Sequence, residues 1–213
     1  MHTAPKSVRP ILILFYALLA VVFSAPAVAN RNTVLVLGDS ISAAYGVPSE
    51  TAWVRLLSDR LANNGLSSWQ VVNASISGET TDGGARRLPA LIEEHDPGVV
   101  IIELGGNDGL RGFPPNIIEN NLADMISRVQ KSGAEAILVG MQIPPNYGRR
   151  YTAMFADIYP KLSDRYGTEL VPFFLEGIYD QDGLMQEDGI HPTAEAQIKL
   201  LDNVWPVLEP VLQ

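Results

Sequence analysis

The sequence predicts an α/β fold of three layers, in which a flavodoxin-like, doubly wound sheet of about five parallel strands is flanked by helices. Short aliphatic runs recur along the chain, and segments with helical periodicity separate them. Strands that alternate with helices pair in parallel through right-handed crossovers. The expected strands are residues 34–37, 71–72, 99–104, 137–139 and 170–171.

Two segments between expected strands show the clear apolar faces of helices. Residues 53–61 carry one such face, between the first two strands. Residues 118–129 carry another, between the third and fourth strands. Asn116 and Glu119 precede it at the spacing of a helix N-cap and its N3 acid.

The later helices are less regular. An apolar face covers residues 151–166, but Pro160 falls inside it, so we expect a kink or an interruption there. The last helix should begin after Pro192, with Thr193 as its cap, and run to about residue 206.

The N-terminal residues have the layout of an export signal. Lys6 and Arg9 precede an apolar run at 11–23, and small residues follow at 27–29. The run is shorter than the roughly 20 residues of a transmembrane helix. We therefore expect residues 1–29 to be a cleaved signal peptide, residues 30–213 to form a single domain, and the protein to reach the bacterial periplasm or the medium. An uncleaved signal anchor is the alternative.

Composition excludes several function classes. The chain has 24 acidic against 15 basic residues, a net charge of −9, so nucleic acids and anionic lipid surfaces are poor electrostatic partners. It has no cysteine, which excludes thiol catalysis and Cys-based metal sites. We expect a monomer without stable membrane insertion.

Polar and glycine residues follow each of the first three strands. Gly38, Asp39 and Ser40 come after the first, residues 75–84 after the second and residues 105–112 after the third. In doubly wound sheets, ligands bind at the carboxyl edge. These three segments are therefore expected to meet at one site.

Two histidines remain outside the expected signal peptide. His95 lies at a polar helix end, where a solvated cation is favourable. His191 lies three residues after Asp188, on a loop that enters the last helix, and a carboxylate at that distance can orient an imidazole base. Taken alone, the short Asp-x-x-His spacing favours a structural or capping role over a catalytic one.

A serine hydrolase needs a hydroxyl near such a base and donors for the oxyanion. Ser40 offers the hydroxyl, Gly78 an unobstructed backbone N–H and Asn107 a side-chain amide. Each has a plainer explanation, since Ser40 could cap a helix and the glycines could form turns. The combination at successive strand ends favours catalysis.

Other common sites fit less well. The segment 38–42 lacks the second glycine of G-x-S-x-G, and neither common phosphate-loop pattern occurs. Asp39, Asp82, Asp108 and Asp188 could gather a hard cation, but no ligand loop fixes them. We expect no metal, and we expect Asp39 and Asp108 to be mainly structural.

Four motifs resemble the conserved blocks of one family. GDS at 38–40, the glycine of SGET at Gly78, the asparagine of GGND at Asn107 and DGIHP at 188–192 are similar to those of the SGNH, or GDSL, hydrolases. The longer sequences around the GDS and SGET motifs resemble one secreted bacterial branch of this family, which comprises thioesterase I, protease I and lysophospholipase L1 together with related arylesterases.

The resemblance implies a mechanism and its residues. Ser40 would be the nucleophile, His191 the base and then acid, and Asp188 its orienter. The Ser40 and Gly78 N–H groups and the Asn107 side chain would form the oxyanion hole. The reaction would be hydrolysis of small acyl esters or thioesters through an acyl-enzyme, without a cofactor.

The acyl group is expected along two apolar, proline-containing loops, although ordinary packing explains them as well. The residues expected to contact it are Leu110, Phe113, Pro114, Ile143, Pro144 and Tyr147. Two other functions stay open. A carbohydrate O-deacetylase of the same superfamily would differ in chain-length preference, and a non-catalytic flavodoxin-like binding module would fail to react with a serine-directed phosphonate.

Overall fold

A five-stranded parallel sheet with the order β2-β1-β3-β4-β5 forms the centre of the molecule. The computed structural model describes Met1 and residues 31–213, so the predicted signal peptide, apart from Met1, lies outside the described residues. The strands are β1 (Thr33–Gly38), β2 (Gln70–Asn73), β3 (Val99–Glu103), β4 (Glu135–Val139) and β5 (Glu169–Val171). The predicted flavodoxin-like, doubly wound fold is confirmed, because this strand order and parallel pairing define it.

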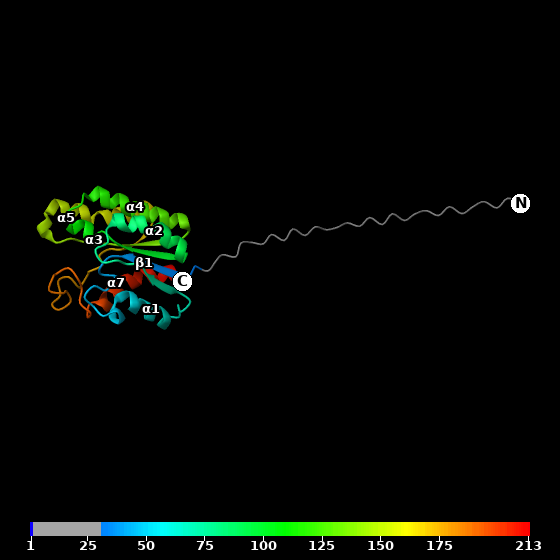
Figure 1. Cartoon of the computed structure of the whole chain (residues 1–213), viewed down its shortest axis with the longest axis horizontal. Helices are drawn as coiled ribbons and strands as arrows, with labels where there is room; N and C mark the ends of the chain where they lie inside the picture. Colours follow the sequence, from blue (N-terminus) through cyan, green and yellow to red (C-terminus); the bar gives the residue numbers. More distant parts are fainter. Residues whose placement is uncertain (2–30) are drawn as a thin grey trace.

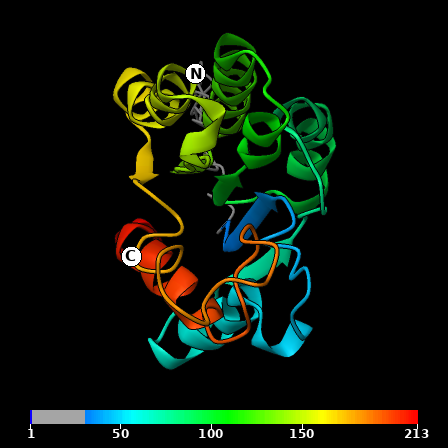
Figure 2. The same cartoon turned by 90° about the vertical axis from the view of Figure 1, so that its left-hand side faces the viewer.

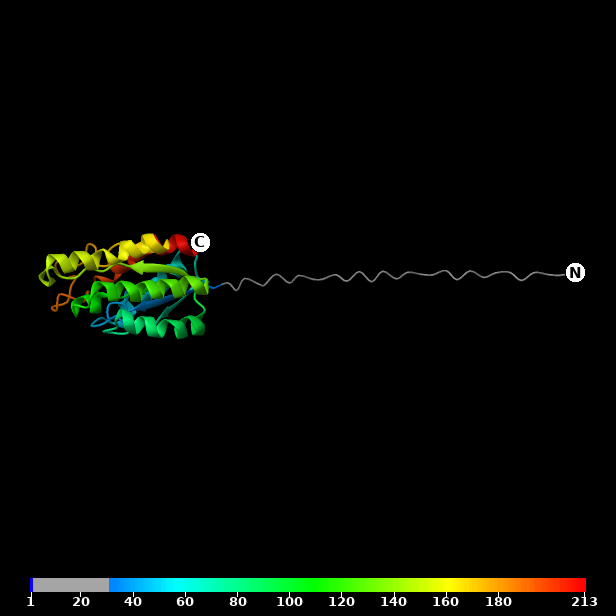
Figure 3. The same ribbon diagram turned by 90° about the horizontal axis from the view of Figure 1, so that it is seen from above.

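Helices cover both faces of the sheet (Figures 1 and 2). Within residues 31–213, seven α-helices and three short 3-10 helices lie between the strands or follow the last of them: η1 (Ser49–Thr51), α1 (Trp53–Asn63), α2 (Thr81–His95), α3 (Gly106–Leu110), α4 (Pro115–Ser132), η2 (Pro145–Tyr147), α5 (Arg149–Ala156), α6 (Ile158–Tyr166), α7 (Gln197–Leu208) and η3 (Glu209–Leu212). Helix α4 packs between α2 and α6 on one face, and α1 packs against α7 on the other. Figure 3 shows the same layers from a third direction.

The core lies on both sides of the two central strands. Every residue of β3 is buried, as are Val34 to Leu37 of β1, because helices cover each face of these strands. The largest fully buried side chains include Trp53 of α1 and Tyr159 of α6, one from each helical layer. The sheet thus provides a rigid base from which the loops at its carboxyl edge project.

Three details of the predicted helices differ from the structure. Helix α4 begins at Pro115 with Pro114 as its N-cap, so Asn116 is not a cap, and Glu119 pairs with Lys161 and Arg165 instead. The expectation of a cap at Thr193 is also wrong. Thr193 donates to the Gly183 carbonyl, and α7 begins at Gln197.

The interruption expected near Pro160 is confirmed. Helix α5 ends at Ala156 and α6 begins at Ile158, with Asp157 between them. Pro160 has no N–H to donate to the carbonyl four residues earlier, which is that of Ala156. In the part of the chain that is described, no helix combines the length and the apolar character that crossing a bilayer demands.

Candidate active site

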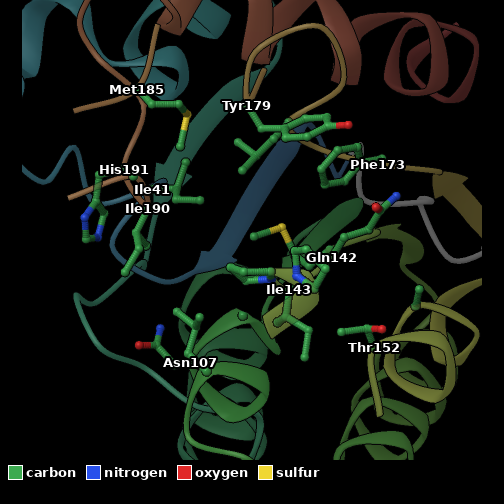
Figure 4. A pocket seen from close by; sticks show the side chains of 18 of the residues that line it. Ile41, Asn107, Gln142, Ile143, Thr152, Phe173, Tyr179, Met185, Ile190 and His191 are labelled. Atoms are coloured by element: carbon green, nitrogen blue, oxygen red, sulfur yellow. The ribbon is translucent and has the colours of Figure 1, made fainter. Parts of the chain in front are cut away.

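The candidate catalytic residues meet where the strand order reverses. Strand β1 lies between β2 and β3, so the segments that follow these three strands share one edge of the sheet. They carry Ser40, Gly78 and Asn107. The loop between β5 and α7 crosses the same edge and brings His191 to it (Figure 4).

Three side chains form a continuous hydrogen-bonded chain. Ser40 Oγ lies 2.9 Å from His191 Nε2, and His191 Nδ1 lies 2.7 Å from Asp188 Oδ2. Asp188 also accepts from the backbone N–H groups of Ile190 and His191, at 2.9 and 3.0 Å. This arrangement lets Nε2 take a proton from Ser40 while the carboxylate holds the ring and faces the charge that forms.

Hydrogen bonding keeps Asp188 ionised. Partial burial acts to raise its pKa, but the hydrogen bonds from the His191 N–H, the His191 ring and the Ile190 N–H outweigh it and lower the pKa to about 2. A carboxylate with this pKa stays negative at any pH where an imidazole titrates. It can therefore stabilise an imidazolium at His191 throughout that range.

Two residues that the sequence did not single out support His191. The ring of Tyr45 lies against the imidazole, with ring centroids 4.5 Å apart. Gln186 donates to the carbonyls of Tyr45 and Pro192, at 2.9 and 3.0 Å, which ties the segment after β1 to the loop of His191. No local spacing links Tyr45 to Gln186, because they are 141 residues apart in the chain.

The structure also places the three predicted oxyanion donors at this edge. Within the described residues, the N–H groups of Ser40 and Gly78 donate no hydrogen bond. Gly78 has a φ of 78°, in the left-handed region that favours glycine. Asn107 Nδ2 donates to Asp39 Oδ2 at 2.9 Å, which leaves the second N–H of that amide available for a ligand.

Two buried carboxyl groups lie close to Ser40 in the structure. Asp39 is held by Asn107 and by the Ile41 N–H, and burial raises its pKa to about 6 against these two bonds. Glu103 Oε2 accepts from the Asp39 N–H at 3.2 Å and from Ser42 Oγ at 2.7 Å. Burial and the neighbouring Asp39 charge raise the pKa of Glu103 well above its ordinary range.

An apolar pocket of about 700 Å³ opens beside Ser40. Asn107 and His191 lie toward one end, and Gln142, Thr152 and Phe173 lie toward the other (Figure 4). Ser40, within hydrogen-bond distance of His191, also lines the pocket. Of the residues expected to contact an acyl group, Leu110, Ile143 and Pro144 line this pocket.

The remaining three residues of that set lie outside the pocket lining. They are Phe113, Pro114 and Tyr147. The Phe113 carbonyl accepts from Tyr151, and Tyr147 donates to the Leu110 carbonyl, so both segments are held on the outer side of the pocket wall. The proline-rich sequence predicted that these loops lie at the carboxyl edge of the sheet, but not whether their side chains face the pocket.

The aspartates weighed as metal ligands serve separate purposes. Asp108 is buried and accepts from the N–H and hydroxyl of Thr81, at 2.9 and 2.6 Å. Asp82 pairs with Arg86 on the surface of α2. Among the described residues, no three or more His, Asp or Glu side chains are grouped so that they could hold a metal ion.

The sequence model of the GDSL-like Lipase/Acylhydrolase family matches residues 36–197. The chain belongs to this family. It is therefore a serine hydrolase, as the resemblance of its four motifs implied. Esterase TesA of Pseudomonas aeruginosa is 53% identical over 184 residues, which cover 86% of this GDSL hydrolase and 91% of that protein.

Two further relatives support the assignment. The Escherichia coli K12 protein named thioesterase 1/protease 1/lysophospholipase L1 is 45% identical over 184 residues, 86% of each chain. The solved structure of the psychrotrophic esterase EstA from Pseudoalteromonas sp. has a TM-score of 0.80 and 42% identity, covering 85% of this chain and 98% of that one. That esterase is described as inhibited by monoethylphosphonate.

Proposed function

We propose that this GDSL hydrolase cleaves esters and thioesters of apolar acyl groups through an acyl-enzyme on Ser40. One observation carries the proposal. The hydrogen-bonded chain of Ser40, His191 and Asp188 stands at the end of a pocket whose walls are mostly aliphatic and aromatic. Such a site combines an activated hydroxyl with a place for an apolar acyl chain.

In the first half of the reaction, Ser40 Oγ attacks the carbonyl carbon as its proton passes to His191 Nε2. Asp188 stabilises the resulting imidazolium. The negative charge that develops on the carbonyl oxygen is met by the N–H groups of Ser40 and Gly78 and the second N–H of Asn107. The C–O or C–S bond then breaks, and Nε2 returns the proton to the departing alkoxide or thiolate.

In the second half, water attacks the acyl-enzyme. His191 Nε2 accepts a proton from the water and afterwards gives it to Ser40 Oγ, while the acyl group leaves as a carboxylic acid. The same three donors hold the second oxyanion. Every proton transfer uses a group that this chain supplies, so the cycle needs no cofactor.

We also propose which classes of substrate the enzyme accepts. The names of the relatives, esterase and thioesterase 1/protease 1/lysophospholipase L1, support aryl and alkyl esters, thioesters and lysophospholipids as candidates. The lining by Leu110, Ile143 and Pro144 supports an apolar acyl group over an acetyl group on a sugar. A rate that rises from acetyl to medium-length acyl esters would agree, and a preference for acetylated sugars would favour a deacetylase instead.

The proposed roles are tested by matched substitutions. Ser40→Ala and His191→Ala should each lower kcat for a soluble ester by roughly 10³-fold or more, since each removes a member of one proton-transfer unit. His95→Ala, at the end of α2, should leave kcat unchanged. Equal losses from the two histidine variants would contradict the assignment of the base, and a Ser40→Ala variant within about tenfold of the parent would exclude that nucleophile.

We also propose that the protein is exported and cleaved near residue 30. The basic residues, apolar run and small residues at 1–29 support this location. Fractionation of the cells that produce it, with N-terminal sequencing of the product, gives the direct measurement. A product that retains Met1 in the membrane fraction would show an uncleaved anchor instead.

A further inference from the structure

The exposed apolar side chains of the molecule are concentrated at one end. Within residues 31–213, every large apolar side chain that is exposed lies in a segment at the carboxyl edge of the sheet, and the opposite edge has none. Some lie in the loops after β1, β2 and β5 and in the first turn of α7. Four gather on the segments after β3 and β4, and these are Phe113, Ile117, Tyr147 and Met154.

Hydrogen bonds join the two segments that carry these four residues. Tyr147 Oη donates to the Leu110 carbonyl at 2.9 Å, and Tyr151 Oη donates to the Phe113 carbonyl at 2.7 Å. Figure 1 shows α3 and α5, which these segments include, at the same end of the molecule. The apolar side chains therefore belong to one surface rather than to two independent loops.

The same surface carries three arginines that form no salt bridge within the described residues. Arg111 follows α3, and Arg149 and Arg150 begin α5. Within residues 31–213, every other arginine forms a salt bridge, but these three do not. Arg149 and Arg150 line a shallow hollow together with Tyr147 and Met154, so the charged and apolar groups are mixed. We call Phe113, Ile117, Tyr147, Met154 and the three arginines the rim patch.

The rim patch is continuous with the acyl pocket. Arg149 belongs to both, since it lines the pocket beside Ser40 as well as the hollow, and Leu110 of the pocket wall immediately precedes Arg111. An apolar acyl chain that enters the pocket would thus pass the rim patch, which carries both apolar side chains and guanidinium groups. Guanidinium groups bind phosphate oxygens, and apolar side chains insert among acyl chains at a lipid interface.

We propose that the rim patch docks the enzyme on a zwitterionic phospholipid surface, with the arginines on headgroup phosphates and the apolar side chains between them. This inference rests on the proposed function, because substrates with apolar acyl chains reside in such assemblies. The net charge of −9 selects the headgroup class. An anionic bilayer would repel the whole molecule, whereas a zwitterionic one offers phosphates without a long-range opposing field.

The test measures binding without turnover. The purified protein is sedimented with vesicles of diether phosphatidylcholine, whose ether links the enzyme cannot hydrolyse. The variant Ile117→Ser/Arg150→Gln changes two rim-patch residues outside the acyl pocket. It should partition onto the vesicles about tenfold less than the parent, since it removes one inserted apolar group and one phosphate contact.

A matched pair provides the control. Ile198 is 45% exposed in the first turn of α7, as Ile117 is 44% exposed in the first turn of α4, and Arg128 is an exposed arginine paired with Asp124. Ile198→Ser/Arg128→Gln should stay within about twofold of the parent in vesicle binding. Both double variants should hydrolyse a short soluble ester at the parent rate, which shows that the fold and the catalytic site are intact.

Three results would overturn the proposal: no vesicle binding by the parent, equal losses from the two double variants, or stronger binding to phosphatidylglycerol than to phosphatidylcholine vesicles. A dimer that Ile117→Ser/Arg150→Gln dissociates, with no vesicle binding, would assign the patch to a second copy of the chain. Failure of soluble-ester hydrolysis alone would instead contradict the proposed function, so the two failures are distinguishable.

Discussion

The triplet Gly38, Asp39 and Ser40 shows why the first strand ends so abruptly. A Cβ on Gly38 would lie 2.6 Å from Glu103 Oε2 and 2.8 Å from the Ser42 side chain, so no larger residue fits between β1 and the buried glutamate. Asp39 then turns its carboxylate toward Asn107, and Ser40 presents its hydroxyl to His191. Each of the three residue types is therefore required by a different contact at the carboxyl edge of the sheet.

The Asp39 carboxylate positions the Asn107 amide. Oδ1 accepts from the Ile41 N–H at 3.1 Å, and Oδ2 accepts from Asn107 Nδ2 at 2.9 Å. Both oxygens therefore act as acceptors, which only a carboxylate can provide. With one of its N–H groups fixed in this way, the amide of Asn107 has its other N–H free for the oxyanion role proposed for it.

Removing one acceptor should therefore lower the rate through Asn107. We expect Asn107→Ala to lower kcat by roughly 10²–10³-fold with little change in KM, because a donor that acts on developing charge is lost. Asp39→Asn, which turns an N–H₂ group toward Ile41 or Asn107, should lower kcat by about tenfold or more. Steady-state kinetics of both variants and of the double variant measure the two effects together.

The double variant distinguishes positioning from an independent role. If Asp39 acts through Asn107, Asp39→Asn costs little further rate once Asn107 is alanine. Fully additive losses would contradict the positioning role. A loss of folded protein that accounts for the lower kcat, measured by the thermal midpoint of each variant, would contradict it as well.

The sequence indicated the candidate catalytic residues but not what holds them. Ser40, Gly78 and Asn107 could be found because they follow successive strands, and His191 because few histidines remain. Asp39 was predicted to be mainly structural, and Glu103 lay hidden in an aliphatic strand. The bonds from Asn107 to Asp39 and from Ser42 to Glu103 join residues more than 60 positions apart, so they depend on how neighbouring strands align rather than on local spacing.

At the scale of elements, aliphatic runs located all five strands, whereas helices were found only where an apolar face was clear. The sequence placed His95 at a helix end but gave no range for helix α2, because Gly83, Gly84 and Pro89 obscure its periodicity. Its start depends instead on contacts from outside the helix. Thr80 caps the Gly83 N–H, and the next residue, Thr81, is held by Asp108 of α3.

The Asp108 contact should contribute measurably to stability. Its two oxygens accept from the Thr81 N–H and hydroxyl in a buried setting, and an asparagine could satisfy only one of them. Asp108→Asn should lower the free energy of unfolding by about 1–3 kcal/mol. The exposed Asp82, also in the first turn of α2, gives the control, and Asp82→Asn should cost less than about 1 kcal/mol. Denaturant unfolding of both variants measures the difference, and equal losses would contradict the structural role of Asp108.

At the scale of the whole molecule, the carboxyl edge of the sheet carries the candidate catalytic residues, the apolar pocket beside Ser40 and the three arginines of the rim patch. Within residues 31–213, the opposite edge has no exposed large apolar side chain. Two carboxyl groups, Asp39 and Glu103, are buried just beneath the reactive edge, where desolvation disfavours their ionised forms. Within the described residues, Glu103 Oε1 has no hydrogen-bond partner, so ionisation would leave a buried charge whose second oxygen nothing stabilises. The candidate site thus includes a buried group, Glu103, whose ionisation would reduce the stability of the fold.

Because Glu103 is buried, the stability of the folded protein should fall as the pH rises. Glu103 has a folded pKa above its ordinary value of 4.5. Below pH 4.5 it is protonated in both the folded and the unfolded chain, so it contributes nothing. As the pH rises through the window between 4.5 and the folded pKa, the unfolded chain releases the proton first, and the free energy of unfolding falls.

Glu103→Gln removes this titration while keeping the shape of the neutral carboxyl group. The Gln oxygen can still accept from Ser42 and from the Asp39 N–H. The thermal midpoint of the variant, relative to the parent, should therefore rise as the pH increases from about 4.5 to about 7. Glu93→Gln, an exposed substitution on α2, should show no such trend. Asp39 faces Glu103 and titrates in both proteins, so its own contribution largely cancels in the difference. A midpoint difference that stays flat, or that falls with rising pH, would show that Glu103 is ionised in the folded protein and that the buried edge tolerates its charge.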